Sequence, residues 1–297
     1  MNKDLFNTIL AIATQGENVK ISKKKKETYE KLIIQTIVEL DKSADQLFSK
    51  DILIRKKAAS YLQRKPLMNL MKNDATIVRE WFIERSNREK ISKAIEQEVE
   101  ESILSTLLST IGFCCERFSK STLLSWTLPI DYLKHGQELL VKHLTHKSSL
   151  VRYTAALALT QFRITEAWDI LYEFIEKANS KMYVEIAIRL FYFGNNRLKI
   201  FDQRDNGEYL RTLDLLNITY HKEGLTQQQI KRFQIALESV YRKKITDEAK
   251  DAIIKALQSI GNNDTITFFN QVENEESDKY RKENIVKAIE VLQQRLT

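Results

Sequence analysis

Apolar residues recur along this chain at the three- and four-residue spacing that marks one face of an α-helix. In the segment 166–177, the apolar positions Ile170, Leu171, Phe174 and Ile175 follow this spacing, with polar residues between them. A repeat of this kind has the period of a helix and not the two-residue alternation of a strand. We therefore expect an amphipathic helix here, and similar helices wherever the pattern returns.

The apolar pattern is itself repeated along the chain. The segment Leu150–Leu159 contains an aliphatic residue followed by Arg, then an Ala pair and a Leu, and the same order occurs 97 positions earlier, at 54–62. A shift of 31 positions aligns Ala156 with Ala187. Two further shifts, of 67 and 32 positions, align 190–196 with 257–263 and 253–257 with 285–289. All four shifts are near multiples of about 32 residues, which predicts one repeated structural unit.

A unit of this length fits a helical hairpin, which buries its apolar face only by stacking on its neighbours. The Ala pairs at 58–59 and 155–156 are expected to let helices of successive units approach closely. Gly194 and Gly261, each followed by two Asn residues, are expected to end their helices in the left-handed backbone conformation.

The order Leu-Val-Arg, two residues, Ala-Ala and then Leu in Leu150–Leu159 resembles the second helix of a HEAT repeat. The resemblance to the HEAT/armadillo class implies an all-α fold, a right-handed α-solenoid of about seven to eight stacked two-helix repeats. Residues 1–50 would be N-terminal capping helices with a Lys-rich segment at 20–26. Residues 51–297 would form a solenoid continuous with the cap, with a longer polar connection at 195–207. HEAT proteins share no common activity, so the fold implies no particular function.

The composition supports an all-α fold and narrows the compartment. The 297-residue chain contains 7 Gly and 2 Pro, too few for the many tight turns of β-sandwiches and α/β enzymes. It has no apolar run long enough to span a bilayer, so we expect no contact with a membrane. Cys114 and Cys115 are expected to be buried, reduced thiols, which predicts a cytoplasmic protein.

Side chains that could carry out chemistry are sparse. His135, His143 and His146 have helical spacing, but a metal site needs three or four ligands with supporting hydrogen bonds. They are therefore expected to be surface residues. The scattered glycines cannot form a phosphate-binding loop. The sequence predicts no catalytic residue, no metal and no cofactor, and a protein that is not an enzyme.

The leading functional hypothesis is a non-catalytic scaffold or adaptor that binds another protein on the concave face of the solenoid. The alternative is a nucleic-acid-binding protein, because the net charge is +7 and the basic excess lies in residues 1–200. The phosphate-contacting strip for that alternative is Arg55, Lys56, Lys57, Arg64, Lys65, Arg79, Arg85, Arg88 and Lys90. The remaining candidate binding residues are Arg152, Arg197, Lys199 and Arg204.

A remote extension of the alternative is an activity like that of a DNA glycosylase. One family of glycosylases acting on alkylated bases is built from HEAT-like repeats, with Trp and Asp residues on a basic concave face. Trp81, Trp126 and Trp168, with Asp131 and Asp169 near the last two, are the residues of these types here. They do not align with that family's motif, and Trp168 lies in an amphipathic helix where it is expected to be a core residue.

Overall fold

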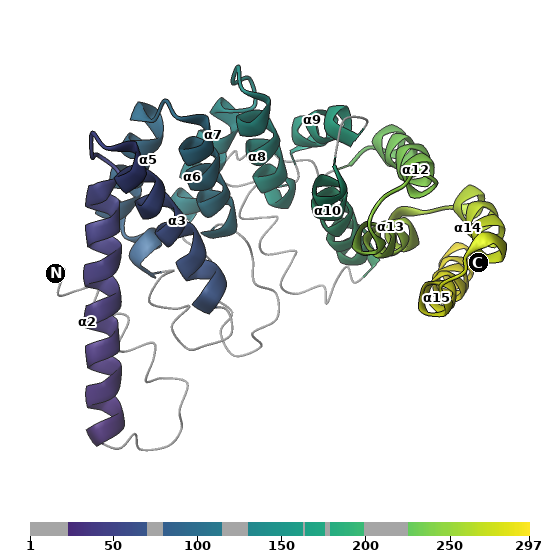
Figure 1. Ribbon diagram of the computed structural model, residues 1–297, viewed down its shortest axis with the longest axis horizontal. Coiled ribbons are helices and arrows are strands. Elements are labelled where there is room, and N and C mark those ends of the chain that lie inside the picture. The colour runs from purple at the N-terminus through teal and green to yellow at the C-terminus, as the bar shows by residue number, and fades with distance from the viewer. Residues whose placement is uncertain (1–22, 70–79, 115–129, 163, 176–178, 199–224) are drawn as a thin grey trace. The chain divides into compact units, whose positions relative to one another are not determined.

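The computed structural model describes residues 23–69, 80–114, 130–162, 164–175, 179–198 and 225–297. Within these ranges every regular element is helical and no strand occurs. The predicted all-α class is therefore confirmed (Figure 1). No helix among the described residues is both long enough and apolar enough to cross a bilayer.

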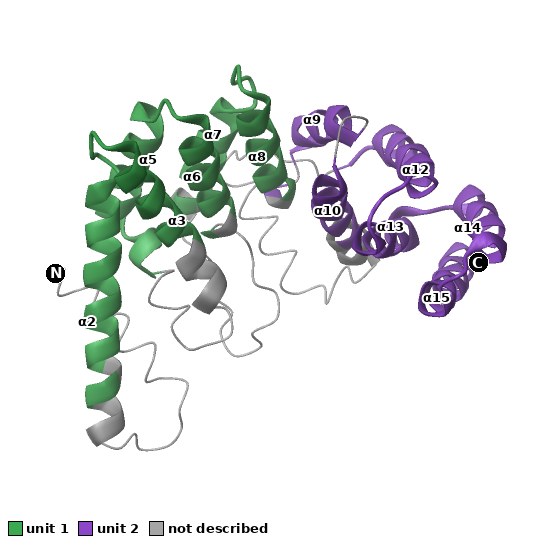
Figure 2. Cartoon of the chain, viewed as in Figure 1, with its two compact units in different colours: residues 1–161 green, residues 162–297 purple. Residues whose placement is uncertain are grey.

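The chain forms two compact units, which Figure 2 shows in different colours. Unit 1 comprises Met1–Gln161 and unit 2 comprises Phe162–Thr297. The sequence placed a cap at residues 1–50 and a continuous repeat region at 51–297, and that division stays a prediction. Each unit has its own buried core, with Trp81 in unit 1 and Trp168 in unit 2 both fully buried. The core position expected for Trp168 is confirmed.

Unit 1 consists of helices that pair in chain order. In each pair the first helix contacts the second, and the second helices pack side by side, α3 against α6 and α6 against α8. The first helices α2 and α5 are also in contact. The three pairs are α2 (Lys23–Gln46) with α3 (Ile52–Asn69), α5 (Arg85–Gln97) with α6 (Glu101–Cys114), and α7 (Ile130–Lys142) with α8 (Ser149–Leu159).

Unit 2 follows the same scheme. Its second helices also pack in series, α10 against α13 and α13 against α15, and its first helices do so as well, α9 against α12 and α12 against α14. A short 3-10 turn, Thr160–Phe162, follows α8. The three pairs are α9 (Thr165–Ile175) with α10 (Ser180–Leu198), α12 (Gln227–Tyr241) with α13 (Asp247–Ile260), and α14 (Asn263–Glu275) with α15 (Lys279–Leu296).

Small residues set the spacing between the second helices, as the sequence predicts. The Ala pairs at 58–59 and 155–156 are buried. A close approach occurs at Gly112 of α6, where an added Cβ would lie 2.3 Å from the Cβ of Ala158 on α8. No larger side chain fits at that distance, so Gly112 allows α6 and α8 to pack backbone to backbone.

The helix ends differ from the prediction at both glycines. Gly261 does cap α13, but its backbone is extended, with φ −65° and ψ 168°, and not left-handed. Glycine is needed there because an added Cβ would lie 2.4 Å from the carbonyl oxygen of Leu257. Gly194 does not end its helix, since α10 continues to Leu198. One interior glycine costs a helix only about 1 kcal/mol, which the hydrogen bonds of the continuing turns offset.

Candidate functional site

The corner between α2 and α3 is fixed by Arg55 in the first turns of α3. Its Nη1 donates to the backbone carbonyls of Ser49 at 3.0 Å and Lys50 at 3.3 Å. Its Nε and Nη2 donate to the two carboxylate oxygens of Glu98, at 2.9 and 3.2 Å, at the corner between α5 and α6. The side chain of Glu98 is only 3% exposed, and its hydrogen bond raises the pKa of Arg55. This bidentate pair joins the first two hairpins.

Arg152 makes the same corner contacts in the third hairpin. Its Nη1 donates to the carbonyls of His146 and Lys147, at 2.9 and 3.1 Å, the residues six and five positions before it. Arg55 bonds the carbonyls at the same two offsets. Ser148 of this corner also donates to the carboxylate of Glu101 at the start of α6, at 2.7 Å. The three corners of unit 1 are thus bonded in series along one edge, which we call the corner edge (Figure 1).

The corner edge exposes large apolar side chains. Val99 is 87% exposed and Leu53 is 63% exposed. A scattered exposed Leu is normal, whereas several large apolar side chains exposed on one edge are typical of an interaction site. We call this group the apolar edge, and it consists of Phe48, Ile52, Leu53, Ile54, Val99 and Leu150.

Around the apolar edge, the carboxylates make internal hydrogen bonds, whereas several lysines form no ion pair among the described residues. Residues 48–57, 98–101 and 146–152 contain six Lys and Arg against four Asp and Glu. All four carboxylates accept internal hydrogen bonds, Glu100 from the Ser102 hydroxyl at 3.4 Å. Glu98 and Glu101 accept the bonds described above, and Asp51 accepts one from the backbone N–H of Leu53 at 2.8 Å. Four exposed lysines have no ion-pair partner among the described residues. These are Lys50, Lys56, Lys57 and Lys147.

Among the described residues, several of the basic side chains predicted to bind phosphate make internal contacts, and their binding role stays a prediction. The structure brings Arg55, Lys56, Lys57 and Arg152 to the corner edge, but the two arginines hold its corners. Elsewhere Arg85 pairs with Glu89 at 2.8 Å, Lys90 pairs with Asp45, and the Arg88 guanidinium lies 5.6 Å from the ring centre of Tyr132. The side chains of Arg64, Lys65 and Arg197, and residues Arg79, Lys199 and Arg204, lie outside the described part, as do Trp126 and Cys115.

The histidines are not all surface residues, which corrects the prediction. His143 is only 8% exposed. Its Nδ1 lies 2.8 Å from the carbonyl oxygen of Leu139 in the last turn of α7, so the buried ring has a polar partner. Carbonyls at a helix C-terminus need such donors. Burial lowers the pKa of His143. In the residues that the structure describes, no group of three or more His, Cys, Asp or Glu could hold a metal ion. Cys114 is a buried thiol, as expected.

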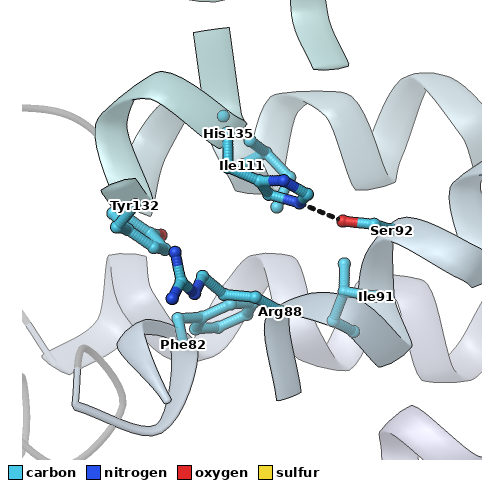
Figure 3. A pocket seen from close by; sticks show the side chains of 8 residues that line it. Phe82, Arg88, Ile91, Ser92, Ile111, Tyr132 and His135 are labelled. Atoms are coloured by element: carbon cyan, nitrogen blue, oxygen red, sulfur yellow. Dashed lines mark hydrogen bonds between the residues drawn. The ribbon is translucent and has the colours of Figure 1, made fainter. Parts of the chain in front are cut away.

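A small cavity lies between α5, α6 and α7 (Figure 3), with room for about one water molecule. Ser92 Oγ and His135 Nε2 face each other there at 2.6 Å. A neutral histidine in this position can accept the serine proton, which is the first requirement of a nucleophilic serine. None of the described lining residues is a carboxylate that would orient the histidine, and the space does not admit an acyl group. The pair therefore serves to join α5 to α7. The lining residues are Phe82, Arg88, Ile91, Ser92, Ile111, Tyr132, His135 and Gly136.

In unit 2 an equivalent arginine is surrounded by acids. Arg281, in the first turn of α15, has a side chain only 7% exposed and pairs with Asp247 at 2.6 Å, Glu276 at 3.2 Å and Asp251 at 3.3 Å. Burial opposes the charge, but these carboxylates outweigh it and raise the pKa of Arg281. Burial likewise opposes the charge of Glu276. Hydrogen bonds from the backbone of Asp278, from Arg281 and from the Tyr241 hydroxyl nevertheless lower the pKa of Glu276.

Sequence reasoning missed the apolar edge, although the sequence carries a signal for it. Residues 52–54 are Ile-Leu-Ile. Three consecutive apolar residues at a helix start span about 200° of its circumference, so they cannot all face a core on one side.

Comparison with known protein families finds no match, and comparison with curated proteins finds none either. Among solved structures, the chain is similar to human deoxyhypusine hydroxylase in complex with glycerol. The TM-score is 0.33 and the identity is 11%, over 88% of this chain and 98% of that chain.

This comparison contradicts the expectation that the chain is not an enzyme, because the structure that it resembles is that of an enzyme. A non-catalytic protein is therefore not proposed below. The identity and the TM-score are too low to assign that enzyme's reaction to this chain, since helical repeat folds carry many unrelated functions.

Proposed function

We propose that this protein is a HEAT-like α-solenoid that binds another protein through the corner edge of unit 1. The serial packing of α3, α6 and α8, and of α10, α13 and α15, supports the solenoid. The observation that carries the binding role is the apolar edge, with six exposed large apolar residues at three bonded corners. Cytoplasmic location is part of the proposal, because the buried Cys114 thiol suits a reducing compartment.

Apolar side chains that remain in contact with water cost free energy. Burying one Leu or Ile side chain stabilises a complex by about 1.5–3 kcal/mol. A protein partner recovers this energy by covering the apolar edge, whereas phosphate groups do not. The corner edge replaces the concave face that the sequence predicted as the binding surface. The reason is that these apolar residues lie at or near the corner within each hairpin, where they are exposed.

Site-specific crosslinking in cells tests the proposal. A photo-crosslinking amino acid replaces Val99, and in a matched control it replaces Asn270, an exposed residue of α14 in unit 2. We expect a protein adduct at position 99 that is absent at position 270. Adding Leu53→Glu and Leu150→Glu should abolish it, because charges then replace the neighbouring apolar groups. If position 99 forms no adducts beyond those of position 270, the corner edge is not a protein-binding surface.

A further inference from the structure

We propose that the segment which occupies the corner edge is an acidic amphipathic helix of the partner, lying across the three corners of unit 1. This inference rests on the proposed function and adds the conformation and the charge of the bound segment.

The conformation follows from the spacing of the corners. Helices α3, α6 and α8 pack side by side, and packed helix axes lie about 8–10 Å apart. The α6–α8 spacing is at the tight end of this range, since Ser105 and Thr154 are hydrogen bonded at 2.7 Å and Gly112 contacts Ala158.

One apolar anchor per corner, at Leu53, Val99 and Leu150, is therefore expected about every 8–10 Å along the edge. A helix rises 1.5 Å per residue, so its positions i, i+7 and i+14 lie about 10.5 Å apart on nearly one face. An extended strand places same-face residues about 6.6–6.8 Å apart, which matches neither one corner nor two. The spacing favours a helix with one apolar residue per corner.

The charge follows from the lysines beside the apolar edge. Lys56 and Lys57 follow Ile54 directly, Lys50 lies between Phe48 and Ile52, and Lys147 lies in the third corner. All four lysines are exposed and have no ion-pair partner in the described part of the chain. The carboxylates Asp51, Glu98 and Glu101 already accept hydrogen bonds within the edge. Carboxylates beside the apolar stripe of a bound helix would complement these lysines.

A synthetic peptide tests both features with the full-length protein. The peptide is about 18 residues long, or about 27 Å as a helix, with Leu on one heptad face, Glu flanking it and Ala elsewhere. Binding is measured by fluorescence anisotropy of the labelled peptide at several salt concentrations. We expect saturable binding by the unmodified protein that weakens as salt rises.

Variants of the corner edge separate the two contributions. Leu53→Gln with Leu150→Gln should weaken binding by about tenfold or more, because two apolar anchors are lost. Lys56→Gln with Lys57→Gln should weaken it about threefold to fivefold and reduce its salt dependence. The control pair Lys31→Gln with Lys93→Gln removes the same charge at exposed positions on α2 and α5 and should leave binding unchanged.

Several results would overturn the inference. Absence of binding, or equal binding of a peptide with Lys in place of every Glu, contradicts the acidic helix. Equal binding of a peptide with the same residues in shuffled order contradicts the heptad spacing. Binding of a single-stranded oligonucleotide that displaces the peptide, and is lost in Lys56→Gln with Lys57→Gln, assigns the lysines to nucleic acid. Protein adducts at position 99 without peptide binding would leave the proposed function standing and reject only this inference.

Discussion

The two units close their hairpin corners with the same kind of residue but surround it differently. In unit 1, Arg55 bonds two corner carbonyls and one buried carboxylate, and apolar side chains project around it. In unit 2, Arg281 meets three carboxylates. Three helix starts of unit 2 carry side-chain caps, at Thr226, Thr246 and Asn262, although Tyr280 beside Arg281 is 67% exposed.

The two kinds of corner differ in how much apolar area they leave in contact with solvent. In a capped, charged corner, side chains accept hydrogen bonds from the backbone N–H groups, and the remaining polar atoms are solvated by water. A corner that exposes Leu53 and Val99 satisfies its hydrogen bonds through Arg55 but leaves apolar area in contact with solvent. We therefore expect the corners of unit 2 to contribute mainly to the stability of the fold, whereas those of unit 1 carry the proposed binding surface.

Replacing Arg281 should have the largest effect on stability. Arg281→Met leaves the buried Glu276 and its neighbours without a positive charge, and we expect a loss of about 3 kcal/mol in the free energy of unfolding. Urea unfolding followed by circular dichroism measures it. Arg242→Met is the matched control, because Arg242 pairs with Glu275 where both side chains are largely exposed. It should cost less than about 1 kcal/mol. Equal losses in the two variants would contradict a stabilising role for the buried ion pairs of Arg281.

The corresponding change in unit 1 should cost less. Arg55→Met removes the pairing of Glu98 and the donor to two carbonyls, and we expect a loss of about 2 kcal/mol in urea unfolding. The double variant Arg55→Met with Glu98→Met should recover part of it, because the uncompensated buried carboxylate is gone. No recovery would mean that the carbonyl contacts, and not the pair with Glu98, hold the corner.

A methyl group at Gly112 tests the close packing within unit 1. Gly112→Ala places a Cβ against that of Ala158, and overpacking of this kind costs about 1–2 kcal/mol. Gly112→Ala combined with Ala158→Gly should restore much of the stability, because the second change vacates the space. Thermal unfolding of the three variants measures the coupling. A double variant as unstable as the sum of the two single ones would contradict the contact.

The sequence predicted the all-α fold and the burial of Trp168 well, because both depend on a repeated apolar period and few turn residues. It did not predict the burial and hydrogen bonding of side chains at the hairpin corners, because position within the repeat does not determine them. The binding role of Arg55 and Arg152 stays a prediction, but the sequence did not show that both side chains donate to corner carbonyls. His143 was predicted at the surface, yet it is buried against Leu139. These contacts depend on the residues at which each helix ends and the next begins, and the spacing of apolar residues does not predict those positions.

Acid should destabilise unit 1 at a higher pH than unit 2. Burial lowers the pKa of His143 below its ordinary 6.5, so the unfolded chain takes up the proton first. The free energy of unfolding then falls as the pH drops below about 6.5. In unit 2, Glu276 has a lowered pKa, so its contribution is present above about pH 4.5 and is lost only below it.

A histidine variant isolates the unit 1 part of this pH dependence. His143→Gln should flatten the change in melting temperature between about pH 7 and pH 5, although its own stability at pH 7 is lower. Glu276→Gln should leave that interval unchanged and alter the profile only below it. If His143→Gln keeps the slope of the unmodified protein, another group titrates there.

The smallest expected effect decides whether the apolar edge is a binding surface or part of the core. Leu53→Gln, Val99→Gln and Leu150→Gln replace side chains that are already exposed, so together they should change the free energy of unfolding by no more than about 0.5 kcal/mol. Leu62→Gln on the same helix α3 replaces a fully buried side chain and should cost about 3 kcal/mol or more. Urea unfolding compares the two. If the triple variant unfolds as readily as Leu62→Gln, the apolar edge holds unit 1 together. If it keeps its stability, and Leu53→Gln with Leu150→Gln also abolishes the protein adducts of a crosslinker at position 99, these side chains serve a partner and not the fold.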